Sequence, residues 1–281
     1  MFATLIGALG APGLGPAELA ALGLEPVSDG RGSRVAAADG GAGIVADWRD
    51  AATSTPAAVK ASLLGPFSAA RLHGGDPIAW AERVGVVAAE LAVAGCAFVE
   101  IEEPEAVAAA ADGALRTGFV AALRRVTDIA AGRAHLSLVL TGGNVDGLGA
   151  STLFDLPFAS YAFDLIAGPE NWRLIAEAPG DRGIVCGALD PADEADDRPE
   201  PLVWAAHYAA STRGRGLERV GLANGSSLES LSPDRATRKL EALVSAAALA
   251  SLEDPKELAA RLDPRAVDAR SAALGRFRPP R

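Results

Sequence analysis

Cysteine is scarce in this sequence: Cys96 and Cys186 are the only two among 281 residues. Each lies in a short apolar run, which excludes a disulfide framework and predicts two buried thiols in a reducing compartment. The N-terminus has no basic segment, and its apolar run is short and interrupted by glycine. We therefore expect neither a signal peptide nor a membrane-spanning helix, and we expect a cytoplasmic protein.

Positive charge is also in deficit, with 26 lysines and arginines against 36 aspartates and glutamates, a formal net charge of −10. An acidic surface repels phosphate backbones and anionic lipids, so neither nucleic acid nor a membrane is an expected partner. A hydrophobic content of 49% is otherwise that of a globular protein. The expected partner is a small molecule, and the sequence leaves the oligomeric state open, a homodimer included.

Short apolar runs recur along the chain, each followed by a turn and an alanine-rich stretch. Runs of this length are typical of strands buried on both faces of a parallel sheet. The runs are residues 2–6, 25–28, 59–64, 97–101, 136–140, 160–165, 183–189 and 219–223. Helices are expected between them, among them 77–94, 106–131 and 233–252. Eight strands alternating with helices predict α/β architecture, a single (β/α)8 TIM barrel domain over residues 1–281.

Candidate site residues follow from this fold, because barrels of this kind form their active sites at the C-terminal ends of the strands. Polar residues are concentrated just after the apolar runs. The candidates are Arg31, Glu102, Glu103, Asn144, Asp164, Trp172, Asp190, Asn224 and Ser226. The acidic segment 191–201 is expected to be a solvated loop after the seventh strand, and 275–281 a loosely held tail.

The strand ends also carry a series of short motifs in a recognisable order. They read LIG at 5–7, LEPVSDG at 24–30, KASLLGPF at 60–67, IEEP at 101–104, GN at 143–144, DLIAGPENWRL at 164–174 and SSL at 226–228. This series resembles the catalytic domain of cobalamin-independent methionine synthase over nearly the whole chain. The wider superfamily includes uroporphyrinogen decarboxylase and corrinoid-dependent methyltransferases.

The family's zinc ligands, two cysteines, a histidine and a glutamate, correspond to Val139, Thr141, Asp164 and Ser226 here. Valine cannot ligate a metal, and the hydroxyls of threonine and serine are poor zinc ligands. His135 lies at the start of its strand, so it is expected to make a cap or helix contact. The resemblance therefore predicts a relative that binds no zinc.

The amino-acid pocket implied by the resemblance has changed as well. Arg31 replaces an acid that receives an ammonium group, and Glu102 replaces an aspartate. An arginine at this position suits a carboxylate or phosphate. The alternative is that Arg31 pairs with Asp29, Glu102 or Glu103 and only neutralises the pocket. Arg34 lies nearby and slightly favours the anion-binding interpretation.

Two further candidates have structural alternatives. Trp172 is placed to stack on a flat ligand such as a pterin, but a hydrophobic cap explains it equally well. His207 lies on an expected helix, where packing is the simpler role. Glu102 and Glu103 point to opposite sides of an extended chain, so they do not form a two-carboxylate hydrolase pair.

By resemblance, the leading hypothesis is methyl or one-carbon transfer with a small anionic or pterin-like ligand. Glu102 and Asp164 would be catalytic, Arg31 would hold an anion, and Asn144 and Asn224 would orient the ligand. A tetrahydrofolate-type methyl donor or a corrinoid is the cofactor class implied. The alternatives are a metal-free lyase or decarboxylase, as in uroporphyrinogen decarboxylase, and a binding protein without catalysis.

Overall fold

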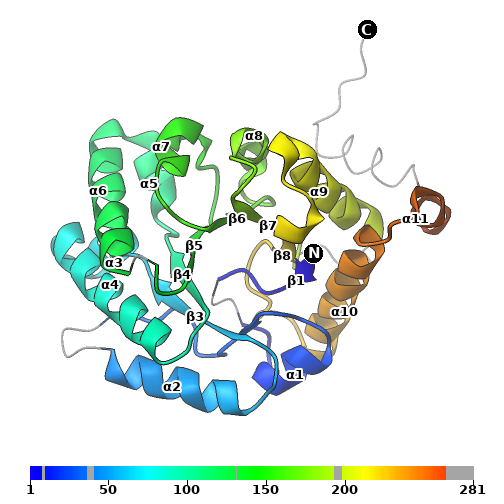
Figure 1. Ribbon diagram of the computed structural model, residues 1–281, viewed down its shortest axis with the longest axis horizontal. Coiled ribbons are helices and arrows are strands. Elements are labelled where there is room, and N and C mark those ends of the chain that lie inside the picture. The colour runs from blue at the N-terminus through cyan, green and yellow to red at the C-terminus, as the bar shows by residue number, and fades with distance from the viewer. Residues whose placement is uncertain (8–9, 37–40, 131, 193–197, 264–281) are drawn as a thin grey trace, which may run out of the picture.

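A computed structural model describes residues 1–7, 10–36, 41–130, 132–192 and 198–263. Eight parallel strands form one curled sheet with the order β1-β8-β7-β6-β5-β4-β3-β2 (Figure 1). The strands are β1 Phe2–Ala3, β2 Val27–Ser28, β3 Val59–Leu64, β4 Phe98–Glu102, β5 His135–Leu140, β6 Ser160–Asp164, β7 Gly183–Leu189 and β8 Val220–Asn224. The predicted (β/α)8 barrel is confirmed.

The sheet closes between its two shortest strands, β1 and β2. The Glu25 N–H donates to the Ala3 carbonyl at 2.9 Å, and the Thr4 hydroxyl donates to the Pro26 carbonyl at 2.6 Å. The expected first strand reached Ile6, but its ladder with β8 ends at Ala3. Beyond that point the backbone bonds partly to a side chain, because the Ile6 N–H donates to Asn224.

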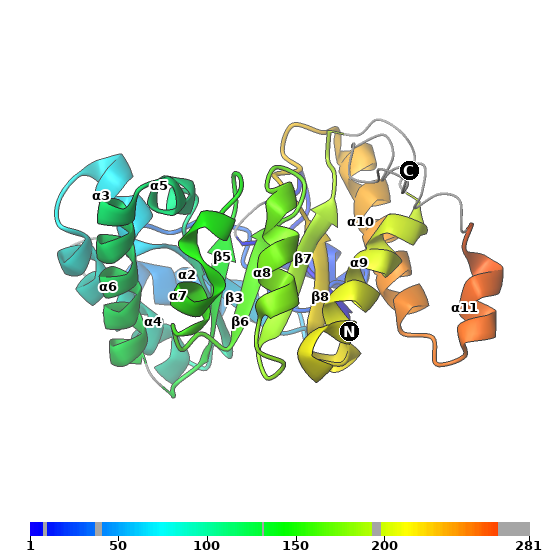
Figure 2. The same ribbon diagram turned by 90° about the horizontal axis from the view of Figure 1, so that it is seen from above.

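Helices surround the strands (Figures 1 and 2). They are α1 Pro16–Ala21, α2 Ala42–Thr53, α3 Pro66–His73, α4 Pro77–Val93, α5 Ala106–Ala111, α6 Gly113–Ala130, α7 Ala150–Phe154, α8 Trp172–Glu177, α9 Pro199–Ser211, α10 Pro233–Ala250 and α11 Pro255–Arg261. Several begin with proline, whose fixed φ suits a first helical turn. In α4 the Asp76 carboxylate also caps the Ile78 N–H at 3.1 Å. In the described residues, no helix is both long and apolar enough to cross a membrane.

Two expected boundaries differ from the structure. The helix expected over 106–131 is broken at Asp112, which is extended (φ −127°, ψ 119°) and whose carboxylate accepts a hydrogen bond from the Ala114 N–H at 2.8 Å. That cap ends α5 and begins α6. The loop expected over 191–201 is shorter than predicted, because α9 begins at Pro199. Residues 193–197 of that loop and the tail 275–281 lie outside the described residues.

The two cysteines are buried and free, as the sequence predicted. Burial raises the pKa of Cys96 to about 11 and that of Cys186 to about 12, so both thiols stay protonated at neutral pH. Protonated, buried thiols are poor nucleophiles and poor metal ligands.

The inside of the barrel has three layers. Side chains alternate along each strand, so residues two apart share a face. On the inner face, polar groups lie at the strand starts, as in Ser137 and Ser160. An apolar layer follows, formed by Ile6, Val139, Ala162, Val185 and Ala223. Polar and acidic side chains then return at the strand ends, so the barrel presents two polar ends separated by an apolar layer.

Candidate functional site at the C-terminal ends of the strands

Glu102 ends β4 and is buried beside Gly7, in the segment that follows β1. A Cβ added to Gly7 would lie 2.5 Å from Glu102 Oε1, so the two residues are in close contact, and the φ of +54° at Gly7 favours glycine. Strands β1 and β4 are not neighbours, since β2 and β3 lie between them. The Glu102 carboxylate therefore reaches across the mouth of the barrel rather than along its wall.

Asp164 ends β6 and is held by three backbone donors. Its Oδ1 accepts from the N–H groups of Ile166 and Ala167, both at 2.9 Å, and its Oδ2 accepts from the Gly142 N–H at 3.3 Å. Burial raises the pKa of Asp164 above its ordinary value, the three donors lower it, and the Asp190 carboxylate raises it. The side chain thus fixes the loops after β5 and β6 and holds a proton more readily than an exposed aspartate.

Asn224 ends β8, and residues next to it or to its partner Ile6 lie close to both acids. Its Oδ1 accepts from the Ile6 N–H at 3.0 Å, next to the Gly7 against which Glu102 packs. A Cβ on the adjacent Gly225 would lie 3.1 Å from Asp164 Oδ1. Glu102, Asn224 and Asp164 therefore lie along one rim, and all three are among the candidates that the sequence placed at the strand ends.

Arg31 follows β2 in an exposed turn, where its backbone N–H donates to Asp29 Oδ1 at 3.0 Å. Across the described ranges, no ion pair joins its guanidinium to an acidic side chain. Arg34 instead forms the ion pair, with Asp47 at 2.6 Å. Burial raises the pKa of Asp29, and the Arg31 N–H and both nearby guanidiniums oppose that rise. The Arg31 charge thus acts on Asp29, one of the acids named in the alternative, but without an ion pair among the described residues.

Asn144, Asp190 and Ser226 also lie in loops after strands. The Asn144 side-chain carbonyl accepts from the Glu170 N–H at 2.9 Å, which ties the loops after β5 and β6. Asp190 Oδ1 accepts from the Ala192 N–H at 3.0 Å, and its carboxylate acts on the pKa of Asp164. Ser226 is exposed and accepts from Asn224 Nδ2 at 2.9 Å through its carbonyl.

The structure does not bring Glu103 to this rim. Its carboxylate is fully buried against the N-terminus of α3, where it accepts from the Phe67 N–H at 3.0 Å and the Ser68 N–H at 2.7 Å. The Ser68 hydroxyl donates to it as well, at 2.6 Å. Burial raises the pKa of Glu103 to about 7, although all three hydrogen bonds lower it. The Glu103 carboxyl group therefore caps the N-terminus of α3.

Trp172 also lies apart from the rim, at the start of α8. Its ring meets Trp204 and Tyr208 of α9 edge to face, at centroid distances of 5.1 and 5.3 Å. Its indole nitrogen is buried without a hydrogen-bond partner in the described part of the chain. The contacts of Trp172 are therefore those expected of a hydrophobic cap.

Of the four positions that the resemblance matches to zinc ligands, Val139, Thr141, Asp164 and Ser226, only Asp164 carries a side chain that suits zinc. Val139 is fully buried in the apolar layer, and both Asp164 oxygens already accept backbone hydrogen bonds. Among the residues that the structure describes, no three His, Cys, Asp or Glu side chains are grouped closely enough to hold a metal.

Sequence reasoning missed the opposite end of the barrel. There, at the strand starts, Lys60 and Glu100 form an ion pair of 2.9 Å with exposures of only 1% and 6%. A lysine inside VKASLL and a glutamate inside FVEIE were the available signals, since charges are rarely fully buried unless they are paired. His135 lies at this end, on the strand start where the sequence placed it, but its ring contacts Ser160 of β6 and Phe98 of β4 instead of forming the expected cap or helix contact.

The fold thus defines a (β/α)8 barrel in which two strands, β4 and β6, end in the buried acids Glu102 and Asp164.

No protein-family model matches the sequence, and no curated protein matches it either. Among solved structures, the chain is similar to a B12-independent methionine synthase from Shewanella sp. W3-18-1, solved with selenomethionine. That match has a TM-score of 0.72 and 15% identity over 92% of this chain and 98% of that chain.

Two further structures share the architecture. A putative vitamin-B12 independent methionine synthase from Listeria monocytogenes matches with a TM-score of 0.65 and 14% identity, over 83% of each chain. A methyltransferase from Methanosarcina mazei matches with a TM-score of 0.52 and 15% identity, over 73% of this chain and 63% of that chain. At these identities the likeness shows a shared fold.

Proposed function

We propose that this barrel transfers a methyl or other one-carbon group to or from a small ligand at the C-terminal ends of its strands, without zinc. The observation that carries the proposal is the rim formed by Glu102, Asn224 and Asp164, with two buried carboxylates at the mouth. The fold likeness to a methionine synthase, a putative methionine synthase and a methyltransferase supports the reaction class by analogy.

Methyl transfer from a pterin-type donor needs one proton given and one proton taken. The N–CH3 bond breaks with its electron pair left on nitrogen, and that nitrogen gains a proton. The acceptor forms its new bond to carbon with a lone pair and loses a proton. Two acids on one rim can serve these two steps. Asp164, with its raised pKa, is suited to give the proton, and Glu102 across the mouth to take one.

Arg31 supplies the anion-binding group in this proposal. Its guanidinium is exposed and has no acidic partner in the described ranges, so it is available to a ligand carboxylate. In the alternative, decarboxylase chemistry, both Arg31 and Arg34 would hold carboxylates of the substrate. Because Arg34 is engaged by Asp47, one of those two arginines is already occupied, which favours transfer over decarboxylation.

The test is methyl transfer from 5-methyltetrahydrofolate labelled with 13C in the methyl group, followed by NMR with a small-molecule extract as the acceptor source. We expect the labelled carbon to move to a new compound, at an unchanged rate after chelator dialysis. Glu102→Gln should lower the rate by about 100-fold or more. Glu105→Gln is the matched control, because Glu105 lies three residues on and pairs with Arg71 at the surface.

Two results would contradict the proposal. Label that stays on the folate with every acceptor source would rule out this donor class. A rate abolished by the chelator and restored by zinc would rule out the zinc-independent part alone.

A further inference from the structure

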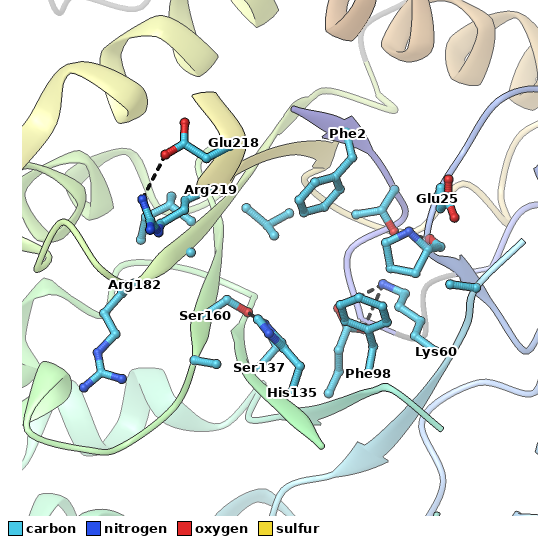
Figure 3. Close-up of a pocket in the computed structure, with 18 of the residues that line it drawn as sticks. Phe2, Glu25, Lys60, Phe98, His135, Ser137, Ser160, Arg182, Glu218 and Arg219 are labelled. Atoms are coloured by element: carbon cyan, nitrogen blue, oxygen red, sulfur yellow. Dashed lines mark hydrogen bonds and ion pairs between the residues drawn. The ribbon is translucent and has the colours of Figure 1, made fainter. Parts of the chain in front are cut away.

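A cavity of about 630 Å³ opens at the N-terminal end of the barrel, opposite the rim described above (Figure 3). Its lining comes from the start of every strand or the residue before it. The lining residues that carry the argument are Phe2, Phe98, His135, Ser137, Ser160 and Val185. Its volume falls within the range of about 300–1,000 Å³ that is usual for small-molecule sites.

The cavity is separate from the C-terminal site. The apolar layer of Ile6, Val139, Ala162, Val185 and Ala223 lies between the two ends, and Val185 belongs to both that layer and the cavity wall. In β5, Ser137 faces the cavity, Val139 belongs to the apolar layer, and Thr141 follows at the other end. A ligand at the N-terminal end therefore does not touch Glu102 or Asp164.

The charged groups of the cavity floor neutralise each other. Lys60 Nζ lies 2.9 Å from the Glu100 carboxylate and also donates to the Leu5 carbonyl. The Ser62 hydroxyl donates to the same carboxylate at 3.1 Å. Both charges are thus paired and hydrogen-bonded, which leaves neither free for a charged ligand.

His135 and Ser160 form the next part of the floor. His135 Nε2 lies 2.8 Å from Ser160 Oγ, and the imidazole packs against the Phe98 ring at a centroid distance of 5.4 Å. Burial lowers the pKa of His135, and the Glu100 carboxylate opposes that shift. A lowered pKa keeps the ring neutral at physiological pH. The floor is therefore polar without net charge.

Ser137 supplies the specific polar contact. It is 6% exposed, it lines the cavity, and its hydroxyl has no hydrogen-bond partner among the described residues. Its neighbours across the sheet are Glu100 on one side and Ser160 on the other, and both are bonded elsewhere. A buried hydroxyl without a partner is unfavourable, so a ligand that bonds to it gains affinity.

The entrance does not favour an anion. Arg219 is paired with Glu218 at 2.9 Å, and Arg182 donates to the Phe158 carbonyl at 3.0 Å with Asp181 beside it at 3.9 Å. Glu25 adds a further acid to the lining. Figure 3 shows Glu25, Arg182, Glu218 and Arg219 in the same view as the cavity floor. The acids at the entrance thus outnumber the arginines.

We propose that this cavity is a second binding site, for a small uncharged molecule with a flat apolar body and one hydroxyl or carbonyl group. The apolar body packs against Phe2, Phe98 and Val185, and the polar group bonds to the Ser137 hydroxyl. Neither part of this site depends on the function proposed for the C-terminal rim.

The test uses 2-naphthol as the probe and isothermal titration calorimetry on the full chain, with 2-naphthoate as its anionic counterpart. We expect saturable one-site binding of 2-naphthol and at least tenfold weaker binding of 2-naphthoate. Ser137→Ala should weaken 2-naphthol by about threefold to tenfold. Ser230→Ala, which removes an exposed hydroxyl after β8, is the matched control and should leave the affinity unchanged.

A blocking variant locates the site independently of the hydroxyl. Ala159 lines the cavity beside Ser160, so Ala159→Phe fills it and should abolish binding while circular dichroism reports an intact fold. The proposal is overturned if 2-naphthol shows no saturable binding to the wild type, or if a folded Ala159→Phe variant binds it normally. Equal binding of 2-naphthoate would overturn the assignment of an uncharged ligand.

Discussion

The Asn224 side chain accepts a hydrogen bond of 3.0 Å from the Ile6 backbone N–H, across 218 residues of sequence. The same amide donates to the Ser226 carbonyl at 2.9 Å, so both of its polar atoms are used. The bond joins the last strand to the segment that follows the first, where the β1–β8 ladder has already ended. Asn224 therefore continues the closure of the barrel where backbone pairing stops.

Asn224→Ala should lower the free energy of unfolding by about 1–3 kcal/mol, because it leaves the buried Ile6 N–H without an acceptor. Urea unfolding monitored by circular dichroism measures this loss. Asn144→Ala is the control, since the bond from Asn144 to the Glu170 N–H is exposed, and its loss should be smaller. Equal losses in the two variants would mean that Asn224 has no special part in closing the barrel.

The buried ion pair at the other end gives a second prediction. Lys60→Met leaves the Glu100 carboxylate buried without its cation, which should cost about 3–5 kcal/mol of unfolding free energy. The double variant Lys60→Met with Glu100→Leu should recover much of that loss, because it removes both charges. Arg124→Met breaks an exposed pair with Asp155 and should cost about 0–1 kcal/mol. A double variant no more stable than the single one would contradict this account.

The sequence alone predicts the barrel fold, because a strand buried on both faces is a short run of apolar residues. The runs at 59–64 and 183–189 match β3 and β7 residue for residue. The first predicted strand extends too far, because its ladder with β8 ends at Ala3. The Ile6 N–H bonds instead to the side chain of Asn224, 218 residues later in the sequence. Local patterns cannot report a partner more than 200 residues away.

The site was predicted less completely, for a related reason. Glu102 and Asp164 follow from the rule that barrel sites lie at strand ends. Glu103 lies at the same place in sequence, yet its partners Phe67 and Ser68 lie about 35 residues earlier and take its carboxylate out of the mouth. The N-terminal cavity does not follow from that rule, because its lining residues, such as Ser137, lie near the strand starts.

Glu103 gives a prediction for the pH dependence of stability. Its pKa is about 7 in the folded chain against an ordinary value of 4.5, so the folded state binds a proton more tightly than the unfolded state. The stabilising contribution is complete below pH 4.5 and is lost as the pH rises through 7. Glu103→Gln should remove this loss, which is on the order of 3 kcal/mol for a shift of this size.

Urea unfolding at pH 5 and at pH 8 measures the effect as the difference between wild type and Glu103→Gln. The exposed Glu177 provides the control, because Glu177→Gln should leave the pH dependence of the wild type intact. If Glu103→Gln loses as much stability as the wild type between pH 5 and pH 8, then Glu103 does not titrate in this range.

The last prediction concerns Arg31, whose guanidinium has no acidic partner in the described part of the chain. Arg31→Glu should therefore lower the free energy of unfolding by only about 0–1 kcal/mol, a cost that comes from placing a like charge near Asp29. The same change should weaken the binding of 5-methyltetrahydrofolate by tenfold or more, since it sets a carboxylate against the carboxylates of that ligand.

Arg34→Glu is the matched control three residues on. It breaks the pair with Asp47 and places like charges together, so it should destabilise the fold. Thermal melts and calorimetric titration on the two variants separate the roles. An Arg31→Glu variant that melts early but binds the folate normally would show that Arg31 stabilises the turn after β2 and takes no part in holding a ligand.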